Sequence, residues 1–372
     1  MSIPSPDVGQ IASAGGPAGP RVLLLVPART YRAADFLLAA ARMGLDLVVG
    51  SDGALPLGGR QVIPVNPADP EASARRALAR AGMVSAVVAA DAPMLPLAAT
   101  VAGLMGLPHN PVEAVRNAAD KTRQRQRWAA AGVPQPRFEI IPAAAPVGTV
   151  RRAAETVGFP CVVKAVSLSA SQGILRADGP AAAATAAARI RRVLAAAGRP
   201  DREPLLVEEY ITGPELSIDG LLEGGDLTPV AVFDKPVMTD GPTFEETLLV
   251  TPSRLAPDVI DGAVRTARHA ARALGLRTWA VHAELRVTGD GPAMLELAAR
   301  SIGSLCSRAL RFPAARAWKS SSSPAPSASP SPRSATTQHG PPECSCSPCR
   351  ARACCAPSKA GTAPQPSPAS AA

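Results

Sequence analysis

Two glutamates, Glu284 and Glu296, are predicted to face each other across a hairpin. Their carboxylates would repel each other unless a cation lay between them. Residues 282–300, HAELRVTGDGPAMLELAAR, predict two strands joined by a three-residue hairpin loop at 289–291. In that register Glu284 lies directly opposite Glu296, with Cβ atoms roughly 5 Å apart. A hard cation such as Mg²⁺ prefers carboxylate oxygens and turns this repulsion into coordination, so the pair is a candidate metal site.

The same register divides the hairpin into an apolar face and a polar face, because side chains alternate along a strand. The expected core face carries Ala283, Leu285, Val287, Leu295, Leu297 and Ala299. The opposite face carries His282, Glu284, Arg286, Glu296 and Arg300. Arg300 is placed there to neutralise an anionic substrate or a transferring phosphoryl group. A second interpretation stays open, a solvent-facing hairpin whose Glu and Arg side chains pair with one another.

A lysine ends an apolar strand predicted in residues 158–165, GFPCVVKA. An unpaired ammonium group is costly to bury, so Lys164 predicts an anionic partner. The loop that follows, SLSASQG, offers the hydroxyl of Ser171 among its serines and a flexible Gly173, and it suits the binding of phosphate oxygens. The alternative is a surface lysine followed by an ordinary loop.

The segment LLVEEYITGPELSIDG, residues 205–220, predicts a strand that runs out into a short linker. Backbone N–H and C=O groups exposed in such a linker can hydrogen-bond an adenine edge. Glu215, which follows a Gly-Pro turn, can accept hydrogen bonds from ribose hydroxyls. The alternative is a solvated acidic turn at the end of a strand.

The elements that position these residues fall into two kinds of pattern. The first hundred residues predict a small doubly wound α/β domain, from strand patterns at 21–27, 45–50, 61–65 and 84–89 alternating with helix patterns at 33–43 and 71–81. It contains no GxGxxG, so no dinucleotide is predicted. Residues 117–136 then introduce a charged helix, and the following strands and helices predict an α+β layout.

These patterns predict four segments along the chain. They are a flexible N-terminus at 1–19, the α/β domain at 20–110, the α+β domain at 111–312 and a low-complexity tail at 313–372. The tail is rich in Ser, Pro and Ala and has no apolar period. Its cysteines lack the paired spacing of a zinc site, so zinc is not predicted. Our leading hypothesis for the tail is a shifted reading frame that begins near Phe312.

The net charge of +9 suggests nucleic-acid binding until it is divided along the chain. The tail holds six Lys or Arg and one Glu, a net +5, which leaves +4 for the rest. Basic and aromatic residues do not interleave in the tail, so no nucleic-acid partner is predicted.

Cysteine content and hydropathy indicate the compartment. Five of the seven cysteines lie in the tail, so no disulfide framework is predicted. No charged region followed by an apolar run stands at the N-terminus, and the apolar region at 83–107 is interrupted by Asp91, Pro93 and Pro96. We expect a soluble cytoplasmic protein without a membrane partner.

In their order along residues 20–312, these segments resemble the ATP-grasp superfamily. The resemblance lies in NAADKTRQRQRWAAAGVPQP, GFPCVVKAVSLSASQG, VEEYITGPELSIDG, AVFDKP with GPTFEE, and HAELRVTGDGPAMLELAARSIG. The last segment looks most similar to carboxylate-amine ligases and phosphoribosylglycinamide synthetase-like proteins. The resemblance implies a pre-ATP-grasp α/β domain followed by a two-lobed ATP-grasp domain that holds the nucleotide between its lobes.

The resemblance also implies roles for particular residues. Lys121 and Lys164 would hold ATP phosphates, with the loop of Ser171 and Gly173 beside them. Glu208 and the backbone of Tyr210 and Ile211 would bind adenine, and Glu215 would bind the ribose. The remaining implied roles are metal ligation by Glu284 and Glu296, with Mg²⁺ or Mn²⁺, and contact with the γ-phosphate and the acyl phosphate by Lys235 and Arg300.

The implied activity is that of an ATP-dependent, ADP-forming ligase. It would activate a small carboxylic acid as an acyl phosphate for attack by an amine or a similar nucleophile. The alternative is a nucleotide-binding remnant with impaired catalysis. The chain departs from the family pattern at Ala298, where many members have an Asn that ligates metal, and at Ser304, where a second glycine usually follows SIG. The number of metal ions therefore stays open.

Overall fold

The computed structural model describes residues 19–55, 61–143, 145–168, 171–199, 203–236, 241–244, 248–303 and Cys306. The chain divides after Phe312 into two units, and all described residues belong to the first. The predictions about the tail and the one about Ser304 lie outside the described residues. Among the described helices, none is long and apolar enough to cross a bilayer.

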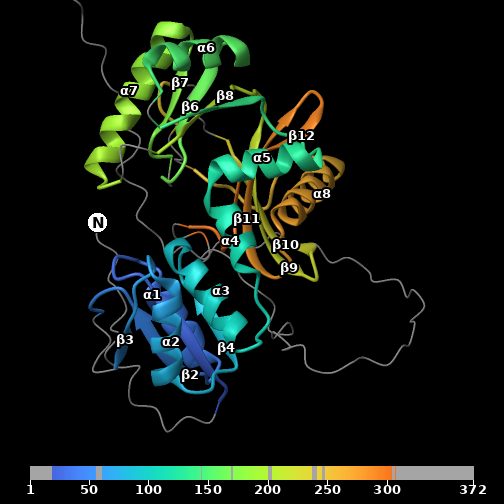
Figure 1. Ribbon diagram of the computed structural model, residues 1–372. Coiled ribbons are helices and arrows are strands. Elements are labelled where there is room, and N and C mark those ends of the chain that lie inside the picture. Colours follow the sequence, from blue (N-terminus) through green and yellow to red (C-terminus); the bar gives the residue numbers. More distant parts are fainter. Residues whose placement is uncertain are drawn as a thin grey trace, which may run out of the picture. The chain divides into compact units, whose positions relative to one another are not determined.

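The first sheet is parallel and has helices on both faces (Figure 1). Its strand order is β3-β2-β1-β4, from β1 (Arg21–Val26), β2 (Asp46–Ser51), β3 (Val62–Pro64) and β4 (Ala86–Ala89). Alternate residues of β1 enter two separate cores: Leu23 packs with α2 (Pro70–Ala81) and α3 (Leu95–Leu104), and Leu24 packs with α1 (Ala33–Arg42). The predicted doubly wound α/β fold is confirmed.

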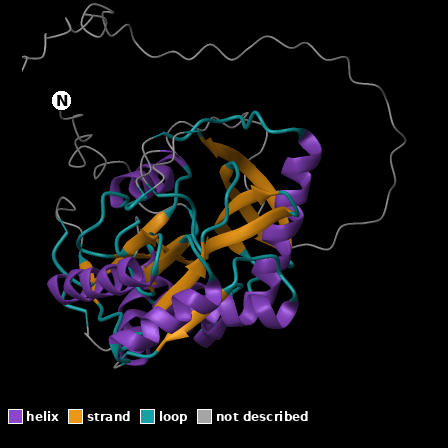
Figure 2. Ribbon diagram, turned by 90° about the horizontal axis from the view of Figure 1, so that it is seen from above, coloured by secondary structure: helices purple, strands orange, loops and turns teal. Residues whose placement is uncertain are grey.

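The other two sheets are antiparallel, which confirms the predicted α+β layout. One has the order β5-β8-β6-β7, from β5 (Phe138–Ile141), β6 (Cys161–Ala165), β7 (Ile174–Ala177) and β8 (Leu205–Glu209), and packs on α6 (Val147–Val157) and α7 (Pro180–Ala196). The other has the order β10-β9-β11-β12, from β9 (Glu215–Glu223), β10 (Asp226–Lys235), β11 (Trp279–Thr288) and β12 (Gly291–Ala298). Its core includes residues of α4 (Val112–Ala119), α5 (Lys121–Ala131) and α8 (Pro257–Leu274). Figure 2 shows the helices flanking these strands.

The hairpin of β11 and β12 pairs Glu284 with Glu296, as predicted. The predicted three-residue loop is wrong, because Thr288 pairs with Gly291 and leaves only two residues in the loop. The register then shifts by one residue before it reaches the glutamates, and this shift restores the expected pair.

The shift is a β-bulge that makes Leu295 the extra residue of β12. Leu285 pairs with Met294, which is fully buried in the core cluster. Leu295 was expected in the core, and that prediction is wrong: it lies outside the buried core cluster and lines the pocket. A bulge redirects a side chain locally, so the core position falls to Met294 instead.

Helix α5 and the segment after it cover the outer edge of β12. The Gln124 side chain acts like a neighbouring strand, since its Nε2 donates to the carbonyl of Leu297 at 2.9 Å and its Oε1 accepts from the Leu297 N–H at 3.1 Å. The N–H of Met294 donates to the carbonyl of Pro134 at 2.8 Å. These bonds satisfy an otherwise open strand edge and fix β12, and with it Glu296.

A glycine between β8 and β9 is expected to be essential for stability. Gly213 has φ of +121°, and a Cβ there would lie 2.0 Å from the carbonyl oxygen of Val287. We expect Gly213→Ala to lower the free energy of unfolding by about 1–3 kcal/mol. Urea unfolding measures the change, with Gly103→Ala in α3 as the control, because a Cβ at Gly103 meets no atom within 4 Å. Equal stability of the two variants would contradict this account.

Candidate nucleotide-binding and catalytic site

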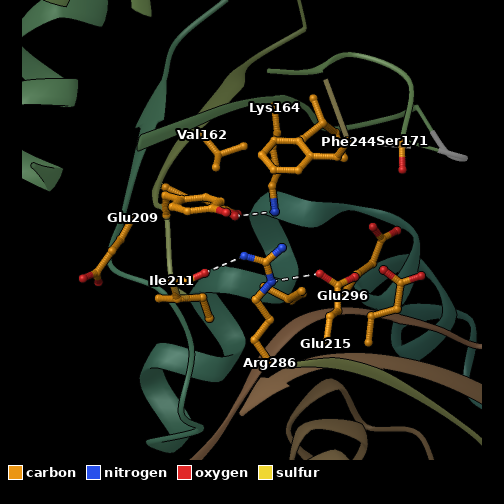
Figure 3. Close-up of a pocket in the computed structure, with 14 residues that line it drawn as sticks. Val162, Lys164, Ser171, Glu209, Ile211, Glu215, Phe244, Arg286 and Glu296 are labelled. Carbon is orange, nitrogen blue, oxygen red and sulfur yellow. Dashed lines mark hydrogen bonds and ion pairs between the residues drawn. The ribbon is translucent and has the colours of Figure 1, made fainter. Parts of the chain in front are cut away.

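A pocket lies where the two antiparallel sheets face each other (Figure 3). The space inside it, open mouth included, is about 640 Å³. Eight of the residues predicted from the sequence line it: Lys164, Ser171, Glu208, Tyr210, Ile211, Glu215, Glu284 and Glu296. The sequence analysis assigned no binding or catalytic role to the other six: Val162, Ile174, Glu209, Phe244, Arg286 and Leu295.

Lys164 finds its anionic partner inside the protein. Its Nζ lies 2.5 Å from Glu208 Oε2, and Arg125 Nε lies 2.7 Å from Glu208 Oε1. Burial raises the pKa of Glu208, but the nearby charges of Arg125 and Lys164 outweigh it and hold that pKa at about 2. Lys164 is therefore fixed at the pocket wall, with its Nζ atom held against Glu208.

Acid is expected to weaken the folded state through Glu208. Its pKa is about 2 in the fold against an ordinary value of 4.5, so its ion pairs stabilise the protein above about pH 4.5, and this contribution is lost as the pH falls toward 2. We expect wild type to lose more stability than Glu208→Gln between about pH 6 and about pH 3 in urea unfolding, because the variant lacks the titrating carboxylate. Equal losses would argue against the assignment.

Glu215 is held by two cations. Lys235 Nζ lies 3.0 Å from its Oε1, and Arg286 Nε donates to its Oε2 at 2.9 Å. Arg286 also donates from Nη1 to the carbonyl of Ile211 at 2.7 Å, as Figure 3 shows. Arg286 thus ties the linker after β8 to β9 and β11, and Lys235 reaches the pocket by contacting Glu215 rather than by lining it.

An aromatic slot forms beside this linker. The rings of Tyr210 and Phe244 stack with centroids 6.1 Å apart, and the guanidinium groups of Arg176 and Arg286 lie 4.7 and 5.2 Å from the Tyr210 ring. Apolar side chains of the pocket lining add to it, namely Val162, Ile174 and Leu295. Flat aromatic and guanidinium surfaces suit a planar heteroaromatic ring.

The opposed glutamates each have a cationic neighbour. Glu284 Oε2 lies 3.5 Å from Lys235 Nζ, and its Oε1 lies 3.2 Å from His282 Nε2. Lys121 Nζ lies 3.1 Å from Glu296 Oε1. Burial raises the pKa of Glu284, but Lys235 and His282 outweigh it, so the pKa lies well below its usual range and the carboxylate is ionised.

The pair fits a metal ion that draws its other ligands from a substrate. Within the described ranges, no group of three or more His, Cys, Asp or Glu side chains can hold a metal ion. Mg²⁺ usually binds one or two carboxylates together with phosphate oxygens and water, which matches Glu284 and Glu296. Ala298, which pairs with His282 on β11, offers no side-chain ligand.

Three predicted residues lie outside the pocket lining, in addition to Lys235. Lys121, the first residue of α5, donates from Nζ to the carbonyl of Leu168 at 2.8 Å beside Glu296. Gly173 has φ of +67°, and a Cβ there would lie 2.9 Å from the Cβ of Ala165, so the loop after β6 requires glycine. Arg300 Nε lies 3.7 Å from Asp91 Oδ1, in a separate cluster.

The comparisons with known proteins agree with this fold and pocket: residues 157–309 match the family model of the ATP-grasp domain, so this part of the chain is an ATP-grasp domain. Among curated proteins the chain is similar to the alanine–anticapsin ligase of Bacillus subtilis strain 168, with 28% identity over 216 residues that cover 54% of this chain and 44% of that protein. It is also similar to the D-alanine–D-alanine ligase of Aromatoleum aromaticum, with 34% identity over 213 residues that cover 53% of this chain and 63% of that one.

A solved structure supports the same fold. The L-amino acid ligase from Bacillus licheniformis superposes with a TM-score of 0.62 at 24% identity, covering 77% of this chain and 68% of that chain. The chain spans less than half the length of the alanine–anticapsin ligase.

Proposed function

We propose that the protein is an ATP-dependent, ADP-forming ligase that joins a small carboxylic acid to an amine through an acyl phosphate. The observation that carries this proposal is the pocket itself. A lysine, an opposed pair of carboxylates and an aromatic slot converge in it, within the residues that match the ATP-grasp domain. ATP, the acid and the amine are its substrates, and the need for ATP favours a cytoplasmic location.

The names of the similar proteins point to amino acids as substrates. They are an alanine–anticapsin ligase, a D-alanine–D-alanine ligase and an L-amino acid ligase. We therefore propose that the acid that is activated is a small amino acid and that the amine is the amino group of a second one.

The pocket residues divide the work of binding ATP. The linker backbone at Tyr210 and Ile211, together with Glu208, would bind adenine beside the aromatic slot. Glu215 would bind the ribose. Lys164 and Lys121 would hold the phosphates together with the loop of Ser171 and Gly173. Since Lys235 and Arg286 each bind one oxygen of Glu215, the carboxylate is held in place, and its remaining lone pairs would accept hydrogen bonds from the ribose hydroxyls.

The reaction would proceed in two displacements. A carboxylate oxygen of the acid attacks the γ-phosphorus, the bond to the bridging oxygen of ADP breaks, and an acyl phosphate forms. The amine then attacks the acyl carbon, phosphate leaves, and the amine gives up its proton. Lys235 and Arg300 would stabilise charge on the transferring phosphoryl group and the acyl phosphate.

Glu284 and Glu296 would hold Mg²⁺, or Mn²⁺ in its place. The metal ion, when bound, supplies positive charge against the phosphate oxygens. Lys235 Nζ lies 3.5 Å from Glu284 Oε2, and Lys121 Nζ lies 3.1 Å from Glu296 Oε1. The two lysines therefore orient the carboxylates and offset their mutual repulsion.

Trapping with hydroxylamine tests the function without knowledge of the amine. The purified full chain is incubated with ATP, Mg²⁺, hydroxylamine and single members of a panel of L- and D-amino acids, and hydroxamate and ADP are measured. We expect both products in equal amounts with at least one acid. ATP binding without either product across the panel would overturn the proposal.

A further inference from the structure

Outside the pocket, two arginines from distant parts of the chain converge on one carboxylate. Arg32, at the N-terminus of α1, has its Nη1 atom 3.9 Å from Asp91 Oδ1. Arg300, just beyond β12, has its Nε atom 3.7 Å from the same oxygen. One carboxylate oxygen therefore faces two guanidinium groups, at distances too long for hydrogen bonds.

Both arginines have buried N–H groups without an acceptor among the described residues, and these are the Nη1 of Arg32 and the Nε of Arg300. The Arg32 side chain is only 8% exposed. Its Nη2 donates to Ser301 Oγ at 2.5 Å, and Arg300 Nη1 donates to the Ser301 carbonyl at 2.9 Å. A buried cationic donor without an acceptor is costly, so the arrangement calls for an anionic ligand.

A chain of contacts connects this cluster to the opposed glutamates. Asp219 Oδ1 accepts from the N–H of Ile302 at 2.8 Å, next to Ser301. The same oxygen lies 3.6 Å from His282 Nδ1, and His282 Nε2 lies 3.2 Å from Glu284. Ser301, to which both arginines donate, is thus connected through these contacts to the side chain of a proposed metal ligand. An anion bound there would lie next to the reaction site.

The first sheet contributes directly to this place. Arg32 and Tyr31 follow β1, and a Cβ at Gly303 would lie 3.2 Å from the Tyr31 hydroxyl oxygen. The loop after β1 and the segment after β12 are therefore packed closely. A substrate between them would contact residues from both ends of the described chain.

We propose that Arg32 and Arg300 together bind the carboxylate of the acid substrate, which makes Arg32 a substrate-binding residue supplied by the α/β part of the chain. The inference rests on the proposed function. A guanidinium group donates two parallel hydrogen bonds to a carboxylate, and two such groups with unused N–H donors hold one anionic group tightly.

The hydroxamate assay tests this proposal with Arg32→Leu and Arg32→Lys. The control is Arg29→Leu, because Arg29 is exposed in the same loop. We expect Arg32→Leu to raise the KM for the acid by roughly tenfold or more while the KM for ATP stays unchanged, since a charge-assisted bond is lost from the acid alone. Arg32→Lys keeps the positive charge but loses the paired N–H donors of the guanidinium group. Its KM for the acid should therefore lie between the values of wild type and Arg32→Leu. A wild-type KM for the acid in either Arg32 variant would overturn the proposal.

A binding measurement separates this proposal from the proposed function if no acid yields hydroxamate. Equilibrium dialysis with inorganic phosphate as the anionic probe is run on wild type, Arg32→Lys and Arg29→Leu in the presence of a non-hydrolysable ATP analogue that fills the nucleotide site. Weaker binding only in Arg32→Lys, relieved by acetate in wild type, supports a carboxylate site. Equal binding in all three proteins, or binding that acetate does not displace, overturns it.

Discussion

The Glu296→Gln variant is expected to bind ATP and yet to form ADP about 10²–10³-fold more slowly than wild type. Glu296 stands opposite Glu284 and is the more exposed of the two, with 32% of its side chain accessible against 26%. Removing its charge leaves one carboxylate to hold the metal ion. Lys121 loses its ion-pair partner at the same time, so its ammonium group is less well placed.

Two measurements make this prediction specific to the metal. Calorimetric titration with ATP should show that Mg²⁺ strengthens binding to wild type and strengthens it much less in the variant. The control Glu223→Gln removes an exposed glutamate from β9 of the same sheet and should behave like wild type. Full ADP formation by Glu296→Gln at low Mg²⁺ would show that the metal assignment is wrong.

The Arg125→Leu variant is expected to lose about 3–5 kcal/mol of folding stability, because it leaves a buried carboxylate with one partner fewer. Arg125 and Glu208 are each 2% exposed and lie 2.7 Å apart. The same guanidinium group donates to the carbonyls of Met294 at 3.2 Å and Leu295 at 2.8 Å. One side chain therefore satisfies acceptors in both antiparallel sheets, and its loss leaves several buried polar groups unsatisfied.

Urea unfolding at neutral pH measures this loss, and Arg127→Leu serves as the control because Arg127 is exposed on the same helix. The control should stay within about 0.5 kcal/mol of wild type. The affinity of the folded Arg125→Leu protein for ATP should also fall. Without Arg125, Lys164 is the remaining ion-pair partner of Glu208, so it is held more tightly by Glu208 and is less available to the phosphates. Similar stability of the two variants would refute the role given to Arg125.

The alternation of apolar and polar residues in the hairpin was enough to predict that Glu284 faces Glu296. It was not enough to predict the length of the hairpin loop or the bulge that together produce this register. A three-residue loop and a two-residue loop with a bulge pair the same glutamates, and only the bulge sends Leu295 to the pocket and Met294 to the core. The choice depends on bonds from Arg125 and Pro134 to β12, which are distant in sequence.

Most pocket residues could be predicted because they lie in strands, or directly after strands, whose sequence patterns are clear. Phe244 could not, because it lies in an irregular segment with no periodicity. Arg286 was placed on the correct face, but its partners Glu215 and Ile211 come from another strand and its linker, so its role needed the fold. Arg32 is farther still from Arg300 in sequence, and no local pattern links the two. The segment boundaries and the individual binding roles stay predictions.

The bulge in β12 has a consequence for how this site can change. Leu295 is extra to the ladder, so it contacts the pocket without taking a place in the core, which Met294 fills. Substitutions at this position can therefore alter the size of the pocket while the sheet, its core and the pair of glutamates keep their places. Position 295 is thus a point where ligand preference can diverge among descendants of this protein, or be redesigned, at little cost to folding.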